Sequence, residues 1–168
     1  MLDAPLHPAL VHVPLGLSFV VPLVAIGIAI AFWRNRLPRS AFAILAALQL
    51  VLAGSGLAAM AAGDQEQRRV EKVVGRKIVH DHEERAEAFV WAAFAVAALA
   101  GALLLVPGRA VPGAAALTIA GTLVVAALAF AAGKAGGEIV YRHGGAAAYS
   151  TQARVAVPGG GELPQDQD

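Results

Sequence analysis

Five histidines are the residues of this chain with the most informative chemistry, because imidazole binds zinc, copper and haem iron and transfers protons near neutral pH. They are His7, His12, His80, His82 and His143. On one helix His7 and His12 would point about 140° apart, and His80 and His82 would also diverge. A site made of these rings must therefore draw them from different segments of the fold.

Four stretches without Asp, Glu, Lys or Arg must position these histidines. They cover residues 4–33, 40–63, 88–108 and 110–133, and are 30, 24, 21 and 24 residues long. A spanning helix needs about 20 mostly apolar residues, and the alternation typical of membrane strands is absent. With 58% hydrophobic residues and a mean hydropathy of +0.64, the chain is predicted to be an all-α polytopic membrane protein. The expected four-transmembrane-helix bundle has helices at about 8–33, 41–62, 86–106 and 114–132.

The segment between the second and third expected spans is polar, yet apolar residues recur in it at helical spacing. Val70, Val73, Val74 and Ile78 carry this pattern. It predicts one amphipathic interfacial helix at about 65–79, lying on the membrane surface or across the end of the bundle. We expect a transmembrane domain over residues 1–145 and a flexible polar tail over 146–168.

Composition excludes several classes of function. Cysteine is absent, which excludes disulfides, thiolate-bound iron–sulfur clusters and c-type haem attachment. A net charge of +1 gives no reason to expect a nucleic-acid partner. The chain carries no pattern of a nucleophile–base pair, a phosphate loop or paired catalytic carboxylates, so an enzyme is not expected. No cleavable signal is expected, since no Lys or Arg precedes a first apolar stretch that is itself too long.

A four-helix topology places all five histidines on the same side of the bilayer, whichever way the chain is inserted. No Lys or Arg precedes the first span, whereas Arg34, Arg36 and Arg39 follow it, which predicts an external N-terminus. Counting the Lys and Arg residues of every loop predicts the opposite orientation, because nine of them lie on the histidine side and four on the other. We give the first span more weight, because the 63–85 segment balances six basic with six acidic residues. Both termini and the histidines are then expected on the periplasmic side.

A cofactor site at this end would take one imidazole from each of several segments. His12 lies where an apolar helix enters the interface, His82 lies on the first turn of the third span, and His143 follows the fourth. A polar ring at such a depth needs a partner. We therefore expect His12, His82 and His143 as candidate ligands, with His7 as a fourth.

Charged residues near the expected ligands have candidate supporting roles. Asp64 and Glu138 could orient an imidazole by accepting its second N–H, and Arg142 could pair with a haem propionate. Ordinary solvation of helix ends is the alternative for Asp64 and Glu138, and pairing with lipid phosphate is the alternative for Arg142.

Several short motifs resemble those of a known family. The opening LHPALVHVPLGL at 6–17 resembles the HPxxVHFPIGL signature of a bacterial family of four-helix integral-membrane proteins, catalogued as domain of unknown function 2231. A Gly63–Asp64 pair, His82 and the closing GGEIVYRHG at 136–144, similar to GGxLVYxHG, continue the match. Val13 stands where the family usually has Phe. The resemblance covers about the first 145 residues.

The resemblance implies that His7, His12, His82 and His143 are the family's shared histidines, and that His80 is an extra one. It also implies a multi-pass protein of the bacterial inner membrane. Some relatives resemble fusions to cytochrome c or Rieske modules, which suggests an electron-transfer setting and a redox protein partner by association only. The resemblance brings no established activity with it.

Three classes of function remain open on the sequence. The first is a redox component that binds b-type haem, or another metal, through histidines on one membrane face. The second is a scaffold or accessory subunit without a cofactor, whose histidines fix loops over the bundle. The third is a small cation handler or transporter, which is the weakest because no charged residue interrupts the apolar middle of any expected span.

Overall fold

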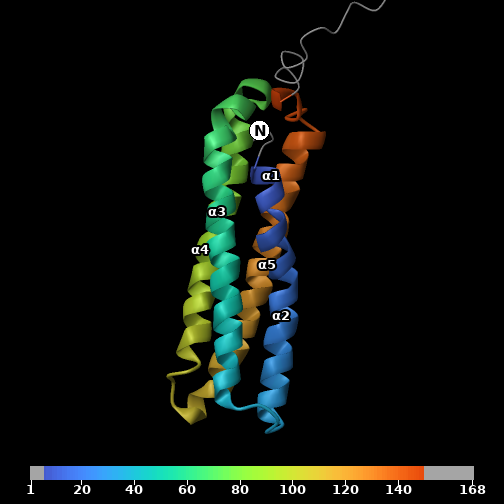
Figure 1. Cartoon of the computed structure of the whole chain (residues 1–168). Helices are drawn as coiled ribbons and strands as arrows, with labels where there is room; N and C mark the ends of the chain where they lie inside the picture. Colours follow the sequence, from blue (N-terminus) through green and yellow to red (C-terminus); the bar gives the residue numbers. More distant parts are fainter. Residues whose placement is uncertain (1–5, 150–168) are drawn as a thin grey trace, which may run out of the picture.

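The computed structural model describes residues 6–149, and this part of the chain is a helical bundle in which no strand is found (Figure 1). A short first helix is followed by four long ones, and 3-10 turns precede the second and fourth of these. The elements are α1 (His7–Leu10), α2 (His12–Trp33), η1 (Arg39–Ala41), α3 (Phe42–Val74), α4 (Arg76–Ala102), η2 (Gly108–Ala110) and α5 (Val111–Tyr141).

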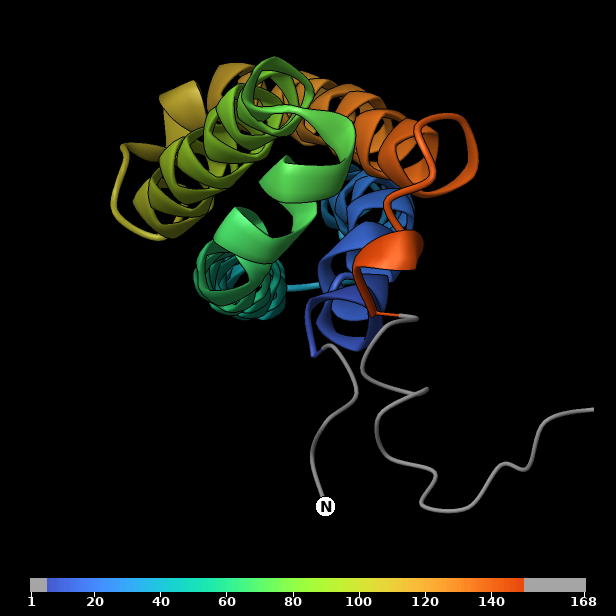
Figure 2. The same ribbon diagram turned by 90° about the horizontal axis from the view of Figure 1, so that it is seen from above.

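The long helices run alternately up and down, and each packs against the next along the chain. The ring closes where α5 packs against α2, as the view along the bundle shows (Figure 2). Each of the segments His7–Trp33, Arg39–Val74, Arg76–Ala102 and Gly108–Tyr141 is long and apolar enough to cross a membrane. The predicted all-α bundle with four transmembrane helices is therefore confirmed.

The segment expected as a separate interfacial helix is helical but continuous with the spans on either side. Residues 65–74 extend α3 and residues 76–79 begin α4, so the expectation of an independent element was wrong. The break is the single residue Gly75, whose φ of +91° suits glycine alone. Of the apolar residues in this segment Val70, Val74 and Ile78 are half-buried and the adjacent Val79 is 5% exposed, whereas Val73 is 45% exposed. The bundle therefore covers most, but not all, of this apolar set.

Helix α5 also continues past its expected end at about residue 132. Gly133 and Lys134 were expected to release it, but Ala135 and Ile139 are buried and hold the last turns against the bundle. Packing of one face thus outweighs the cost of about 1 kcal/mol that each glycine adds to a helix interior. As a result, α5 reaches the level of the histidines at its end.

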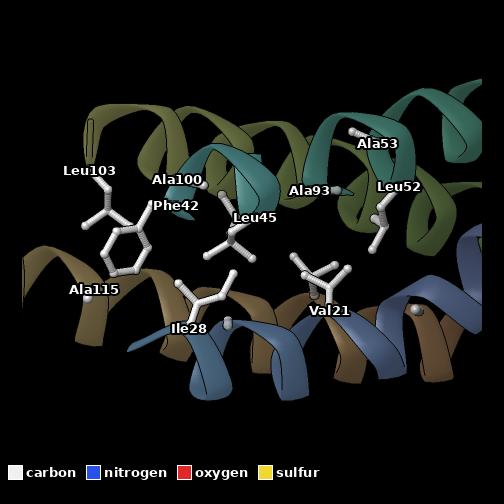
Figure 3. Close-up of a cluster of buried hydrophobic side chains, with 14 of the residues drawn as sticks. Val21, Ile28, Phe42, Leu45, Leu52, Ala53, Ala93, Ala100, Leu103 and Ala115 are labelled. Atoms are coloured by element: carbon white, nitrogen blue, oxygen red, sulfur yellow. The ribbon is translucent and has the colours of Figure 1, made fainter. Parts of the chain in front are cut away.

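The core is built largely of small residues, and large apolar side chains face outward. Ala25, Ala53, Ala93 and Ala100 are buried among Val21, Phe42, Leu45 and Leu103 (Figure 3), whereas Leu23 and Leu105 are 70% and 86% exposed. A Cβ at Gly121 would lie 2.7 Å from Val96 Cγ2, so α4 and α5 approach closely there. Small residues inside and large ones outside are typical of helices packed in lipid.

Most buried polar groups of the spans are satisfied within their own helices. The hydroxyls of Ser18, Thr118 and Thr122 donate to backbone carbonyls three or four residues earlier, at 2.7, 2.8 and 2.7 Å. Arg39, just before α3, lies beside the end of α4 and donates to the carbonyls of Leu103 and Val106. Those bonds satisfy carbonyls where α4 ends.

The tail was expected to be flexible from residue 146, and its first residues instead form a turn that folds back over the bundle. Tyr149 reaches α3, as described below. The rest of the expected tail, 150–168, lies outside the described residues.

Candidate functional site

His7 is fixed at the top of the bundle by a hydrogen bond to another helix. Its Nδ1 lies 2.7 Å from the backbone carbonyl oxygen of Ala59 on α3. A carbonyl can only accept, so Nδ1 must be the protonated nitrogen of the ring. A neutral His7 then keeps an unprotonated Nε2, which is the tautomer found when imidazole binds a metal through Nε2.

His82 comes from α4 and faces His7 edge-on. The two ring centroids are 6.1 Å apart, with an interplanar angle of 81°. The carbonyl of Ala132 lies close enough to influence the His82 ring. However, Nδ1 of His82 is buried and has no hydrogen-bond partner among residues 6–149. Buried polar atoms are nearly always paired, and this nitrogen is an exception within residues 6–149, together with the two amide atoms of Gln49 in the bundle core.

Two glycines let neighbouring backbones lie directly against these rings. A Cβ at Gly63 on α3 would lie 3.0 Å from Nδ1 and 3.2 Å from Cε1 of His7. A Cβ at Gly136 on α5 would lie 3.2 Å from Cε1 of His82. The Gly63–Asp64 pair therefore provides the backbone surface against His7, and the GGEIVYRHG motif provides the one against His82.

The histidine pair separates two hollows at the end of the bundle. The lower hollow, of about 360 Å³, extends toward the membrane centre as far as Phe89 and Val90. The upper hollow, of about 460 Å³, opens at the end of the bundle beside Glu66 and Tyr149. Both are lined by His7, Pro8, His82, Ala86, Gly136, Val140 and Tyr141.

The other two candidate histidines do not join this pair. His12 is exposed, its Nδ1 lies 3.3 Å from the Ala9 carbonyl of its own turn, and it lines the lower hollow. His143 is exposed beyond α5 and lines neither hollow. His7 and His82 are thus the two expected ligands that the fold brings together. Within residues 6–149, no group of three or more His, Asp or Glu side chains is arranged to hold a metal ion.

The charged residues expected beside the ligands take different places. Asp64 lines the upper hollow, whereas Glu138 and Arg142 line neither hollow. His80 is exposed and lies 3.8 Å from Glu83 and 3.4 Å from Glu84 on its own helix, which fits its reading as an extra histidine.

Glu66 and Tyr149 are components of the site that the sequence did not reveal. The Tyr149 hydroxyl donates to Oε2 of Glu66 at 2.5 Å, and the backbone N–H of His7 donates to Oε1 of the same carboxylate at 3.4 Å. Arg69 lies over the Tyr149 ring, 5.6 Å from its centroid. Burial and the Glu66 carboxylate together raise the pKa of Tyr149. No pattern in the sequence links residues 83 positions apart.

Comparison with known families agrees with this architecture. The profile described as "Predicted membrane protein (DUF2231)" matches residues 3–148. The chain belongs to the DUF2231 family. The match covers both histidines of the pair and both glycines against them, and it confirms the resemblance seen in the motifs. No curated protein and no solved structure matches the chain significantly.

Proposed function

We propose that this membrane protein binds a b-type haem, which His7 and His82 would hold, and passes electrons at the histidine-bearing face. The observation that carries the proposal is the facing pair of imidazoles, whose centroids are 6.1 Å apart. Two imidazole nitrogens on one transition metal lie about 4 Å apart, since each metal–nitrogen bond is about 2.0–2.1 Å. The centroid of each imidazole ring lies farther from the metal than its bonded nitrogen does. The observed distance of 6.1 Å between the two centroids is therefore the distance expected for two imidazoles on one metal.

The number of protein ligands favours haem over a bare ion. A structural zinc ion needs four protein ligands and a catalytic one needs three. The residues 6–149 offer no such group beyond the two imidazoles. Haem brings its own equatorial ligands, so one or two histidines suffice. The Nδ1 bond from His7 to Ala59 also resembles the backbone bonds that commonly orient a ligating histidine.

The surroundings of the pair suit a flat apolar group. The two hollows meet at His7 and His82, and each is within the range of about 300–1,000 Å³ that is usual for ligand sites. Gly63 and Gly136 leave no side chain between the backbones and the rings. Asp64, Glu66 and Glu83 line the upper hollow. Their negative charge would stabilise the more positive ferric state and lower the reduction potential.

The opposite end of the bundle supports the proposed placement in the inner membrane. Its loops carry Arg34, Arg36, Arg39 and Arg109, and residues 34–41 and 103–110 contain no Asp or Glu. A basic end is typical of the cytoplasmic side. The haem would then lie near the periplasmic face, within reach of a redox protein partner.

The test is an absorption spectrum of the protein purified in detergent from cells supplied with a haem precursor. We expect a Soret band that shifts on reduction with dithionite, and its loss in His7→Ala and His82→Ala. The exposed His80→Ala and His143→Ala are matched controls that should keep the band. A colourless protein that contains no metal by elemental analysis would refute haem binding and favour the scaffold alternative.

A further inference from the structure

The lower hollow has a mouth on the lipid-facing side of the bundle. Its lining residues come from all the long helices, but those that are exposed belong only to α1, α2 and α5: Pro8, His12, Gly133, Val140 and Tyr141. A Cβ placed on Gly137, which also lines the hollow, would meet nothing within 4 Å. The opening therefore lies between the start of α2 and the end of α5.

The mouth combines an apolar approach with two polar side chains, His12 and Tyr141. Val11, Pro14 and Leu15 on the α2 side and Ala129 and Ala132 on the α5 side continue the hollow inward. Nδ1 of His12 is near the Ala9 carbonyl, which leaves its Nε2 directed to a ligand. An imidazole where an apolar helix enters the interface needs a polar partner. A lipid acyl chain offers none.

We propose that this mouth is a docking site for a quinol, a lipid-soluble carrier whose ring hydroxyl bonds to Nε2 of His12 while its tail stays in the bilayer. The side-chain-free backbone at Gly137 leaves room for a flat ring. His12 and His7 both line the lower hollow, so a quinol here lies next to the proposed haem.

The proposal deepens the haem function and rests on it for the direction of electron flow. A quinol that becomes a quinone loses two electrons and two protons. Haem held by His7 and His82 would supply the one-electron acceptor, and the electrons would then leave to an electron-accepting redox protein. The protons leave through the His12 imidazole to water on the same face, since an imidazole can accept and release a proton near neutral pH.

The experiment measures binding of decylubiquinone to the protein in lipid nanodiscs, together with the Soret band of each sample. Gly137→Leu fills the mouth without a clash, and we expect binding to weaken more than tenfold. Gly54→Leu is the matched control, because Gly54 is exposed on α3 outside both hollows and a Cβ there also meets nothing. His12→Leu removes one hydrogen bond and should weaken binding about three- to tenfold.

The outcomes separate this proposal from the haem assignment. Weaker binding in Gly137→Leu and His12→Leu, with an unchanged Soret band, supports the quinol site. Equal binding in all variants, or none in the wild type, overturns it even when the haem is present. A colourless protein that still binds the quinone in a Gly137-dependent way refutes the haem and keeps the docking site.

Discussion

Replacing Gly63 by alanine should disturb His7 while leaving the helix otherwise intact. The added Cβ would lie 3.0 Å from Nδ1 of His7, which is closer than ordinary contacts, so the ring must move away from α3. A shift of a few tenths of an ångström lengthens and weakens the 2.7 Å bond between Nδ1 and the Ala59 carbonyl. Gly54→Ala adds the same methyl group to the same helix at a place with no neighbour.

The two alanine variants should differ clearly in stability. In a helix interior alanine is favoured over glycine by about 1 kcal/mol, which is the gain expected for Gly54→Ala. At Gly63 this gain is offset by the weakened hydrogen bond of His7, which is worth about 0.5–1.5 kcal/mol when intact. We therefore expect Gly63→Ala to be less stable than Gly54→Ala, by at most about 1.5 kcal/mol.

The assay is reversible unfolding of both variants in mixed micelles, followed by titration of each with haem. Losing the group that orients a ligand typically costs about 10–100-fold in metal affinity, so haem should bind more weakly to Gly63→Ala by a similar factor. Equal unfolding free energies and equal haem affinities for the two variants would refute the role assigned to Gly63 and to the His7 bond.

Three further predictions concern packing, a helix end and pH. Gly121→Ala should destabilise the bundle by about 1–3 kcal/mol through its 2.7 Å approach to Val96, and Val96→Ala should restore much of the loss in a double-mutant cycle. Arg39→Ala should cost about 2 kcal/mol in unfolding free energy because two carbonyls lose a charged donor, whereas the exposed Arg36→Ala should change it by less than about 0.5. The raised pKa of Tyr149 means that its contribution to stability is complete below about pH 10, the pKa of an unfolded tyrosine, and is lost as pH rises through its folded pKa. An alkaline titration followed by tyrosinate absorbance should show one late tyrosine that Tyr149→Phe removes, and a titration identical in both proteins would contradict this.

The transmembrane architecture could be predicted because charge is so costly in hydrocarbon that its absence marks each span. The ends of the spans could not, because they depend on packing between helices. Gly133 to Gly137 signals a stop in the sequence, yet burial of Ile139 carries α5 onward. Likewise, the spacing of the apolar residues around Val79 is suited to packing either on a membrane surface or on a neighbouring helix. Only the structure shows which of these two contacts forms.

The site was predicted in part, because the sequence identifies which histidines share an end but not where their rings point. The rotation of each helix about its axis selects His7 and His82, and it leaves His12 at the mouth and His143 outside. Glu66 could not be predicted for a different reason. It is one of many acidic residues in a polar segment, and its contact with Tyr149 depends on the tail folding back to α3.

The facing imidazoles come from the first and third transmembrane segments, at the two ends of more than seventy intervening residues. The pair can therefore form only after α4 has been inserted, and Gly136 of α5 completes the surface against His82. If the pair holds haem as proposed, truncated products that stop before α5 should remain colourless.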